Sequence, residues 1–215
     1  MKIGIIVAMD KEFELIKSLF KDNDDVCVVK SGIGKVNAAL VAQELAFKYP
    51  KPDIIVSTGC AGGASDLLNV GDVVVSESVR YHDVYCGDDN EYGQIQGMPA
   101  EFLTDEVLIE TATSCNSELD FSIFRGTIAS GDYFVTGAEK TKEIISKVPN
   151  AIAIDMESAA IAQVCHINNI KFVAFRVISD VPIKVENNSK QYNDFWSSMA
   201  ENSFKIVKTF IEKIK

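Results

Sequence analysis

Carboxylates follow three apolar segments of the sequence at the points where strands should end. Asp155 and Glu157 come after one such segment, Asp180 after another, and Glu12 after the first apolar segment of the chain. A buried strand carries charge only where the charge has a partner or a task. Open α/β sheets bind ligands at the carboxyl ends of their strands. The pattern therefore predicts a site that works with several carboxylates.

Each carboxylate also has a structural alternative. Glu157 could cap the helix that it begins, because the free N–H groups there favour an acidic side chain. Asp180 precedes Val181 and Pro182 and could form a turn. Glu12 could stabilise the first turn of a helix. The occurrence of these residues together at successive strand ends favours the functional interpretation.

Three further segments after predicted strands could contact a ligand. Ser31–Lys35 opens a helix whose free N–H groups could bind an anion, but it lacks the nucleotide-binding spacings and could be a plain turn. Thr58–Gly63 contains three glycines, which let backbone approach a ligand or form a flexible connection. Ser130–Val135 carries Tyr133 and Phe134, which could stack on a planar base or cap the core.

Strand and helix patterns alternate along the chain. Strands are expected at Lys2–Ala8, Val26–Lys30, Asp53–Ser57, Asp72–Val79, Phe121–Ala129, Ala151–Ile154 and Lys171–Ile178. Helices are expected at Asp10–Phe20, Lys35–Lys48, Asp105–Glu118, Ala138–Lys147, Met156–Asn168 and Tyr192–Ile214. This alternation predicts an α/β fold, one domain over residues 1–215, with a mixed central β-sheet flanked by helices on both sides. The polar stretch 80–99 predicts a long loop of functional or mobile character.

Composition restricts the classes of partner and compartment. The 215 residues are 47% hydrophobic and 24% charged, and the net charge of −10 argues against nucleic acid or an anionic membrane as partner. Five scattered cysteines and two histidines predict reduced thiols in the cytoplasm and no metal site. The apolar segment 3–9 runs directly into Asp10, so we expect a buried strand rather than a signal peptide. No apolar stretch approaches the length of a membrane span.

Taken together, these segments resemble the 5′-methylthioadenosine/S-adenosylhomocysteine nucleosidases, within the wider nucleoside phosphorylase family. The similarity covers nearly the whole chain. The matching segments are Lys2–Ile6, Ala8–Met9, Glu12, Lys30–Lys35, Thr58–Gly63, Val70–Asp72, Arg80–Asp83, Glu91–Gln94, Ser130–Asp132, Asp155–Glu157 and Arg176–Asp180.

The resemblance implies irreversible hydrolysis of the N-glycosidic bond of an adenine nucleoside through an oxocarbenium-like ribosyl cation, without a cofactor. Asp180 matches the family's general acid, which delivers a proton toward adenine N7. Glu12 matches the carboxylate that positions and deprotonates water. Glu157 matches the residue that binds the ribose hydroxyls near the developing cation. The resemblance also implies a homodimer.

Further matches concern substrate binding. Phe134 matches the ring that stacks on adenine, the Val135 backbone would contact the adenine edge, and Met156 would pack on the ribose. Arg176 is expected among the polar groups near Glu12, Glu157 and the water. The remaining expected substrate-binding residues are Cys60, Ala61, Gly62, Asp155, Ser179 and Tyr192.

Three departures from the family pattern affect substrate choice and local structure. Cys60 stands where many relatives carry serine. The segment 20–29 is short, and a strand pair that relatives place there is missing. Residues 84–90 and Gln96 replace a segment whose apolar side chains, in dimeric relatives, enter the neighbouring subunit's 5′-alkylthio pocket. We therefore expect a more polar 5′-pocket and leave open which 5′-substituent is preferred, whether methylthio, homocysteinyl, deoxy or futalosine-type.

Two other functions remain as alternatives. A purine nucleoside phosphorylase would use phosphate as the nucleophile, but Glu12 lies where that anion would have to approach, which electrostatics disfavours. A non-enzymatic nucleoside- or dinucleotide-binding domain is disfavoured by the missing G-x-G-x-x-G spacing and by the three placed carboxylates.

Overall fold

A mixed eight-stranded sheet forms the centre of the protein in the computed structural model. The structure describes residues 1–48, 50–118, 121–185, 187–198 and 203–214. In chain order the strands are β1 (Ile3–Val7), β2 (Val26–Lys30), β3 (Ile54–Gly63), β4 (Val73–Tyr81), β5 (Phe102–Leu103), β6 (Ile123–Ser130), β7 (Ala151–Asp155) and β8 (Lys171–Asp180).

The strands pair in the order β2-β1-β3-β7-β6-β4-β5, and β8 pairs with both β3 and β4. As a result β3, β7, β6, β4 and β8 close into a ring. β1, β3 and β8 are parallel neighbours, whereas β3 meets β7, and β4 meets β5 and β8, in antiparallel fashion. The parallel neighbours bring their carboxyl ends to one edge, which is where ligands bind in such sheets.

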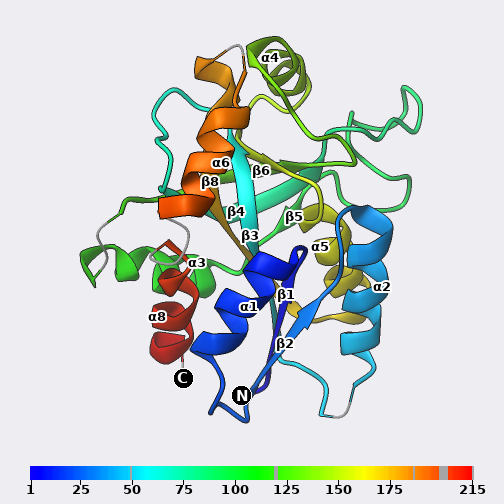
Figure 1. The fold of residues 1–215 in the computed structure, drawn as a ribbon. Coiled ribbons are helices and arrows are strands. Elements are labelled where there is room, and N and C mark those ends of the chain that lie inside the picture. Colours follow the sequence, from blue (N-terminus) through cyan, green and yellow to red (C-terminus); the bar gives the residue numbers. More distant parts are fainter. Residues whose placement is uncertain (49, 119–120, 186, 199–202, 215) are drawn as a thin grey trace.

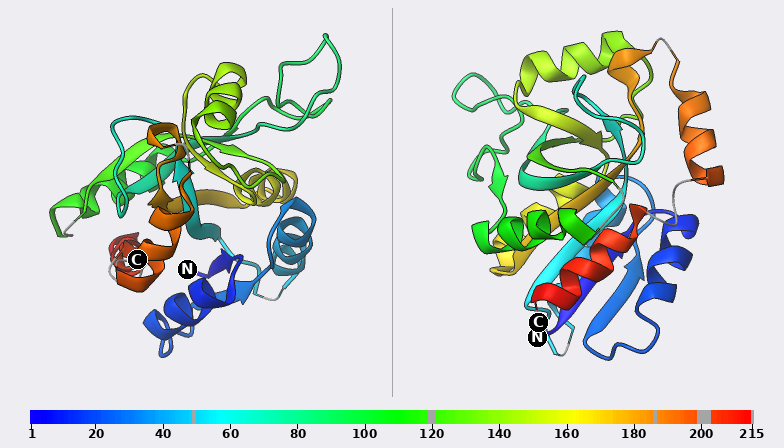
Figure 2. Two further views of the ribbon diagram at one scale, coloured as in Figure 1. Left: turned by 45° about the horizontal axis from the view of Figure 1, so that its top comes forward. Right: turned by 90° about the vertical axis from the view of Figure 1, so that its left-hand side faces the viewer.

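Helices cover both faces of this sheet, as predicted (Figures 1 and 2). The α-helices are α1 (Asp10–Leu19), α2 (Lys35–Ala46), α3 (Glu106–Ser114), α4 (Ala138–Lys147), α5 (Ser158–Asn168), α6 (Ser189–Ser198) and α8 (Lys205–Ile214). Two short 3-10 helices are η1 (Cys115–Glu118) and η2 (Pro182–Lys184). Together these elements make a single-domain α/β fold.

Alternate residues of the central strands enter two separate cores. On β1, Ile6 packs in the cluster that contains α2 and α5, whereas Ile5 packs with α1, α3 and α8. Successive side chains of a strand point to opposite faces, so a strand covered on both sides must be apolar at every position. All five residues of β1 are buried for this reason.

Several elements differ from the sequence-based expectation, most clearly β3, β5 and the C-terminal helices. β3 was predicted to end at Ser57, with a loop from Thr58, but it continues through the glycines to Gly63. β5 was not predicted. In the described residues, the single helix predicted at Tyr192–Ile214 corresponds to α6 and α8, and residues 199–202 of that prediction lie outside the described part of the chain.

The predicted long loop between β4 and β5 extends away from the sheet (Figure 2). Arg80 anchors it, because its Nε donates to the Tyr92 carbonyl oxygen over 2.8 Å. The Arg80 guanidinium also forms ion pairs with Glu91 at 3.1 Å and with Glu101 at 3.4 Å. These contacts hold the base of the loop against the sheet.

Candidate active site

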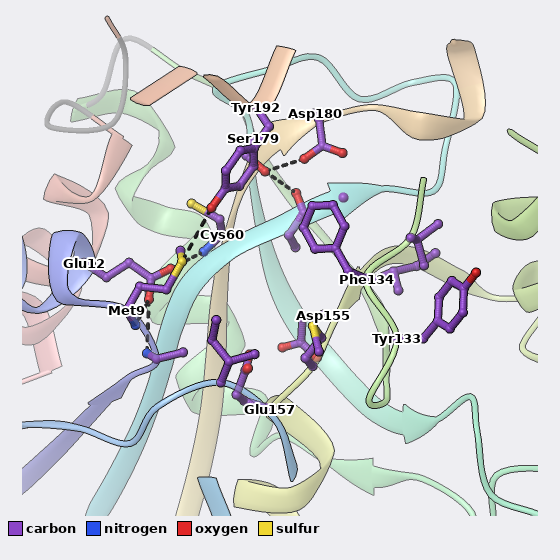
Figure 3. A pocket seen from close by; sticks show the side chains of 17 residues that line it. Met9, Glu12, Cys60, Tyr133, Phe134, Asp155, Glu157, Ser179, Asp180 and Tyr192 are labelled. Atoms are coloured by element: carbon purple, nitrogen blue, oxygen red, sulfur yellow. Dashed lines mark hydrogen bonds between the residues drawn. The ribbon is translucent and has the colours of Figure 1, made fainter. Parts of the chain in front are cut away.

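A cavity of about 130 Å³ lies where the carboxyl-end segments of β1, β7 and β8 meet β3 and the start of α6 (Figure 3). All of the site residues predicted above except Arg176 line it. The lining consists of Ala8, Met9, Glu12, Ile33, Cys60, Ala61, Gly62, Tyr133, Phe134, Val135, Ile154, Asp155, Met156, Glu157, Ser179, Asp180 and Tyr192. The three carboxylates Glu12, Glu157 and Asp180 face it from different sides.

Glu12 is held as a hydrogen-bond acceptor. Its carboxylate accepts from the backbone N–H groups of Cys60 at 2.9 Å, Met9 at 2.9 Å and Ala8 at 3.1 Å. The bonds to Met9 and Ala8 also cap α1, so the helix-stabilising role and the site position coexist. Burial raises the pKa of Glu12, while these hydrogen bonds and the charge of Arg176 oppose the rise. Glu12 is therefore a buried carboxylate with raised basicity.

Asp180 is held by two side-chain donors at the end of β8. Ser179 Oγ lies 2.5 Å from Asp180 Oδ1, and Asn188 Nδ2 lies 2.5 Å from Oδ2. Only 3% of Asp180 is exposed. Burial raises the pKa of Asp180, and the two hydrogen bonds lower it by a smaller amount. Asp180 thus retains a proton at higher pH than an ordinary aspartate. Its side chain bonds Ser179 and Asn188 and does not form the local turn that was the structural alternative.

Glu157 reaches across to the start of α2, where its Oε1 accepts from Gly34 N–H at 2.9 Å. It makes no capping bond to its own helix. That role falls to Asp155, which accepts from the backbone N–H of Ser158 at 3.2 Å. Burial, and next the charge of Asp155, raise the pKa of Glu157 to about 7. The capping alternative for Glu157 is therefore not what the structure shows.

Arg176 lies near Glu12 and Glu157, as expected, but behind the residues that line the cavity, and its direct contact with substrate stays a prediction. Its Nε donates to Asp155 Oδ2 at 2.5 Å, and its Nη2 donates to Ser57 Oγ at 2.6 Å. A Cβ atom on Gly59 would lie 2.7 Å from Arg176 Nη1 and 2.8 Å from Glu12 Oε1. The glycine is required there because the two side chains pack directly over its backbone.

Tyr133 and Phe134 do not cap the core. They are 48% and 56% exposed, and both line the cavity. The Phe134 ring meets the Tyr192 ring edge to face at 6.0 Å between centroids. The Tyr192 hydroxyl in turn donates to Met9 Sδ at 3.5 Å. An exposed aromatic ring at a cavity mouth provides a flat apolar surface for a planar base.

Protein carboxylates occupy two backbone N–H donors of the turn at Ser31–Lys35. Gly34 N–H donates to Glu157, and Lys35 N–H donates to Asp132 Oδ1 at 2.8 Å. An external anion at the start of α2 would have to displace these groups and approach their negative charge. The anion-binding alternative for this turn is therefore disfavoured.

Several cavity residues were given no binding or catalytic role from the sequence. Ala8, Met9, Ile33 and Ile154 line the wall, and each is an apolar residue beside a predicted strand end or turn. Their positions follow once the strand ends are known to converge. Asn188, which contacts Asp180, lies in an irregular segment before α6 and carries no pattern that could have identified it.

The residues that the structure describes carry neither a cluster for a metal ion nor a helix that could cross a membrane. They contain no cluster of three or more histidine, cysteine or acidic residues arranged to hold a metal ion. None of the helices in the described ranges combines the length and apolar character needed to cross a membrane. All five cysteines are free thiols.

This arrangement can perform acid–base chemistry on a bound ligand. Asp180 is a protonatable group on one side, Glu12 is an acceptor on another, and Phe134 offers a stacking surface near them (Figure 3). Burial raises the pKa of both carboxyl groups, so their hydrogen bonds distinguish the two roles. Glu12 meets only N–H donors, which favour its ionised form, whereas the Ser179 hydroxyl beside Asp180 can also accept a hydrogen bond from a protonated carboxyl group.

Comparison with known proteins agrees with this fold. The family model described as the Phosphorylase superfamily matches residues 19–212. The 5′-methylthioadenosine/S-adenosylhomocysteine nucleosidase of Colwellia psychrerythraea 34H, solved in complex with adenine, is 33% identical over 100% of this chain and 96% of its own, with a TM-score of 0.92. The Neisseria meningitidis nucleosidase, solved with methylthio-immucillin-A, is 32% identical over 98% of both chains, with a TM-score of 0.90.

A futalosine hydrolase mutant of Helicobacter pylori is also similar, with 26% identity over 99% of both chains and a TM-score of 0.89. The fold and the site therefore define a member of the phosphorylase superfamily. Within it, the chain belongs to the 5′-methylthioadenosine/S-adenosylhomocysteine nucleosidase family.

Proposed function

We propose that the protein is an N-glycosyl hydrolase that releases adenine from 5′-methylthioadenosine, S-adenosylhomocysteine or a related 5′-modified adenosine. The observation that carries the proposal is the pairing of a buried, protonatable Asp180 with a buried acceptor, Glu12, in one cavity. Family membership supplies the substrate class, since relatives of this fold bind adenine and methylthio-immucillin-A.

In the proposed reaction the bond between C1′ and N9 breaks, and its electron pair leaves with adenine. Asp180 gives its proton to N7, so the base departs uncharged. Glu157 binds the ribose hydroxyls and stabilises positive charge on the sugar. Glu12 takes a proton from the water whose oxygen bonds to C1′. The products are adenine and the 5′-substituted ribose, and no cofactor is needed.

The test of this function is adenine release in buffer without phosphate. We expect release from 5′-methylthioadenosine at full rate, and we expect added phosphate to yield no ribose 1-phosphate. The physical reason is the Glu12 carboxylate at the nucleophile position, together with Glu157 and Asp132 on the N–H groups of the nearby turn. Chromatography of the sugar product distinguishes the two reactions. A phosphorylated sugar as the main product would establish the phosphorylase alternative instead.

A homodimer is also proposed. Val36 and Leu40 on α2 are 71% and 66% exposed, and Ile33, just before the helix, is 53% exposed. The spacing of four residues places Val36 and Leu40 on one face of the helix. A contiguous exposed apolar face of this kind is typical of a protein contact. A monomeric mass in sedimentation equilibrium would contradict the proposal.

The cytoplasm is the proposed compartment. Five free thiols, with no disulfide among them, suit a reducing environment. The Tm of the folded protein should therefore be the same with and without a reductant.

We further expect weak discrimination at the 5′-position. The polar loop 84–96 contributes no side chain to the cavity of its own chain, so in a dimer it is the partner's loop that would complete the tail pocket. Burial of a methylthio group in an apolar pocket favours binding by roughly 1–2 kcal/mol, and a pocket with a polar lining would not provide this favourable free energy. The preference for 5′-methylthioadenosine over adenosine in kcat/KM should then be about tenfold or less. A preference on the order of several hundredfold would contradict this expectation.

A further inference from the structure

Asn188 is a fully buried polar residue to which the reaction above assigns no role. It lies immediately before α6, and its exposed fraction is 0%. Its side chain contacts two residues of the cavity wall, Asp180 and Val135, and the Gly137 backbone before α4. We propose that Asn188 is a positioning residue that holds the Asp180 carboxyl group at a fixed position relative to the Val135 backbone. This inference rests on the proposed hydrolase function.

The hydrogen bonds of Asn188 connect these parts directly. Its Nδ2 donates to Asp180 Oδ2 at 2.5 Å and to the Val135 carbonyl oxygen at 3.2 Å. Its Oδ1 accepts from Gly137 N–H at 3.2 Å, just before α4. Its own carbonyl oxygen accepts from the backbone N–H of Tyr192 at 3.1 Å, which joins it to the first turn of α6. All donor and acceptor groups of the side chain are used.

These partners determine which way the amide faces. Gly137 N–H can only donate, so the amide oxygen must point toward it. The NH₂ group must therefore point toward Asp180 and Val135, and a flipped amide would oppose donor to donor and acceptor to acceptor. The orientation of Asn188 is determined by backbone groups that do not titrate.

This fixed orientation of the Asn188 amide shifts the protonation equilibrium of Asp180. An amide NH₂ can donate to a carboxylate but cannot accept a proton from a carboxylic acid, whereas the Ser179 hydroxyl can do either. Asn188 therefore favours the charged form of Asp180, which is the form left after a proton has passed to the base. Removing the amide should make Asp180 hold its proton more tightly.

Other groups near Asp180 do not produce the same effect. The Cys60 thiol on β3 and the Tyr192 phenol on α6 interact with its charge, and burial raises the pKa of both, which keeps them neutral near pH 7. No charged side chain contributes to the raised pKa of Asp180 itself. Glu12 and Glu157 must be ionised to act, so they control the acidic limb of a pH profile and not the alkaline limb.

The experiment measures kcat/KM for adenine release against pH in the full-length protein. The alkaline limb of this profile reports the pKa of the general acid, Asp180. Asn188→Ala should move that limb upward by about one pH unit or more, as expected for loss of a hydrogen bond to a charged group. It should also lower kcat roughly tenfold, because a carboxyl group that holds its proton more tightly is a weaker acid. Asn188→Asp keeps the acceptor toward Gly137 but sets a second carboxyl group against Asp180, so its limb should move further upward.

Thr141→Val is the matched control. Thr141 is fully buried and its hydroxyl donates to the Gly137 carbonyl oxygen at 2.9 Å, so the variant weakens the same helix start without touching Asp180. Its alkaline limb should coincide with that of the unmodified protein even if its Tm falls.

The inference would be overturned if the alkaline limbs of Asn188→Ala and Asn188→Asp coincided with that of Thr141→Val. If Asn188→Ala fails to fold, the similarly shaped Asn188→Asp decides alone. Failure of the unmodified protein to release adenine would instead contradict the proposed function, so the two results are distinguishable.

Discussion

Asp180→Asn should lower kcat for adenine release by about 10²–10⁴-fold, the usual contribution of a general acid. The amide has nearly the same shape and can still bond Ser179 and Asn188, but it has no proton of suitable acidity to give to N7. The nucleoside should still bind, because stacking on Phe134 and the backbone contacts do not depend on Asp180. Single-turnover rates and an equilibrium Kd, measured on the same preparation, separate chemistry from binding.

The matched control for this substitution is Asp72→Asn. Asp72 is also a buried carboxylate, and it accepts from Asn69 N–H at 2.8 Å outside the cavity. A comparable loss of activity in the control would indicate a general effect of removing buried carboxylates. A loss of less than about tenfold in Asp180→Asn would show that another group is the acid.

Much of the scaffold could be predicted because its strands are buried on both faces. A run such as that of β1 has no polar position, so it can only be a core strand, and its carboxyl end places the next carboxylate at the sheet edge. The same logic placed Asp155, Glu157 and Asp180 correctly on the cavity wall. The mixed sheet and the covering helices followed from the alternation of patterns.

The part that could not be predicted depends on contacts between distant residues. The glycines after Ser57 favour a loop locally, but β8 pairs with β3 from Ile54 to Gly62 and keeps the strand extended. Gly59 is required by the approach of Glu12 and Arg176, neither of which is near it in sequence. Asn188 likewise gains its role only when the segment before α6 folds against β8.

The position of Arg176 depends partly on contacts that the sequence does not reveal. Its place near Glu12 and Glu157 was expected, whereas its ion pair with Asp155 and its close approach to Gly59 were not. It acts on the site through charge. Arg176 opposes the rise in the pKa values of Glu12 and Glu157, and it neutralises Asp155 in a buried ion pair.

Glu12→Gln should also reduce kcat by about 10²–10⁴-fold, because the attacking water then lacks a base. A second effect follows from geometry. Both carboxylate oxygens of Glu12 accept from backbone N–H groups, Oε1 from Cys60 and Oε2 from Met9 and Ala8. A glutamine must turn its NH₂ toward one of these donors, which leaves a buried N–H without an acceptor. We therefore expect a loss of about 1–3 kcal/mol in the free energy of unfolding as well.

The pH profile separates these two effects of Glu12→Gln. In the unmodified protein the acidic limb of kcat/KM reflects ionisation of Glu12, whose pKa burial has raised, so activity should begin to fall at a higher pH than an ordinary glutamate would produce. In the variant that limb should lose the contribution of Glu12 and retain the contribution of Glu157, with its pKa of about 7. Glu14→Gln, an exposed position on the same helix, controls for the change of charge. Retention of full activity and an unchanged acidic limb in Glu12→Gln would show that the water is activated elsewhere.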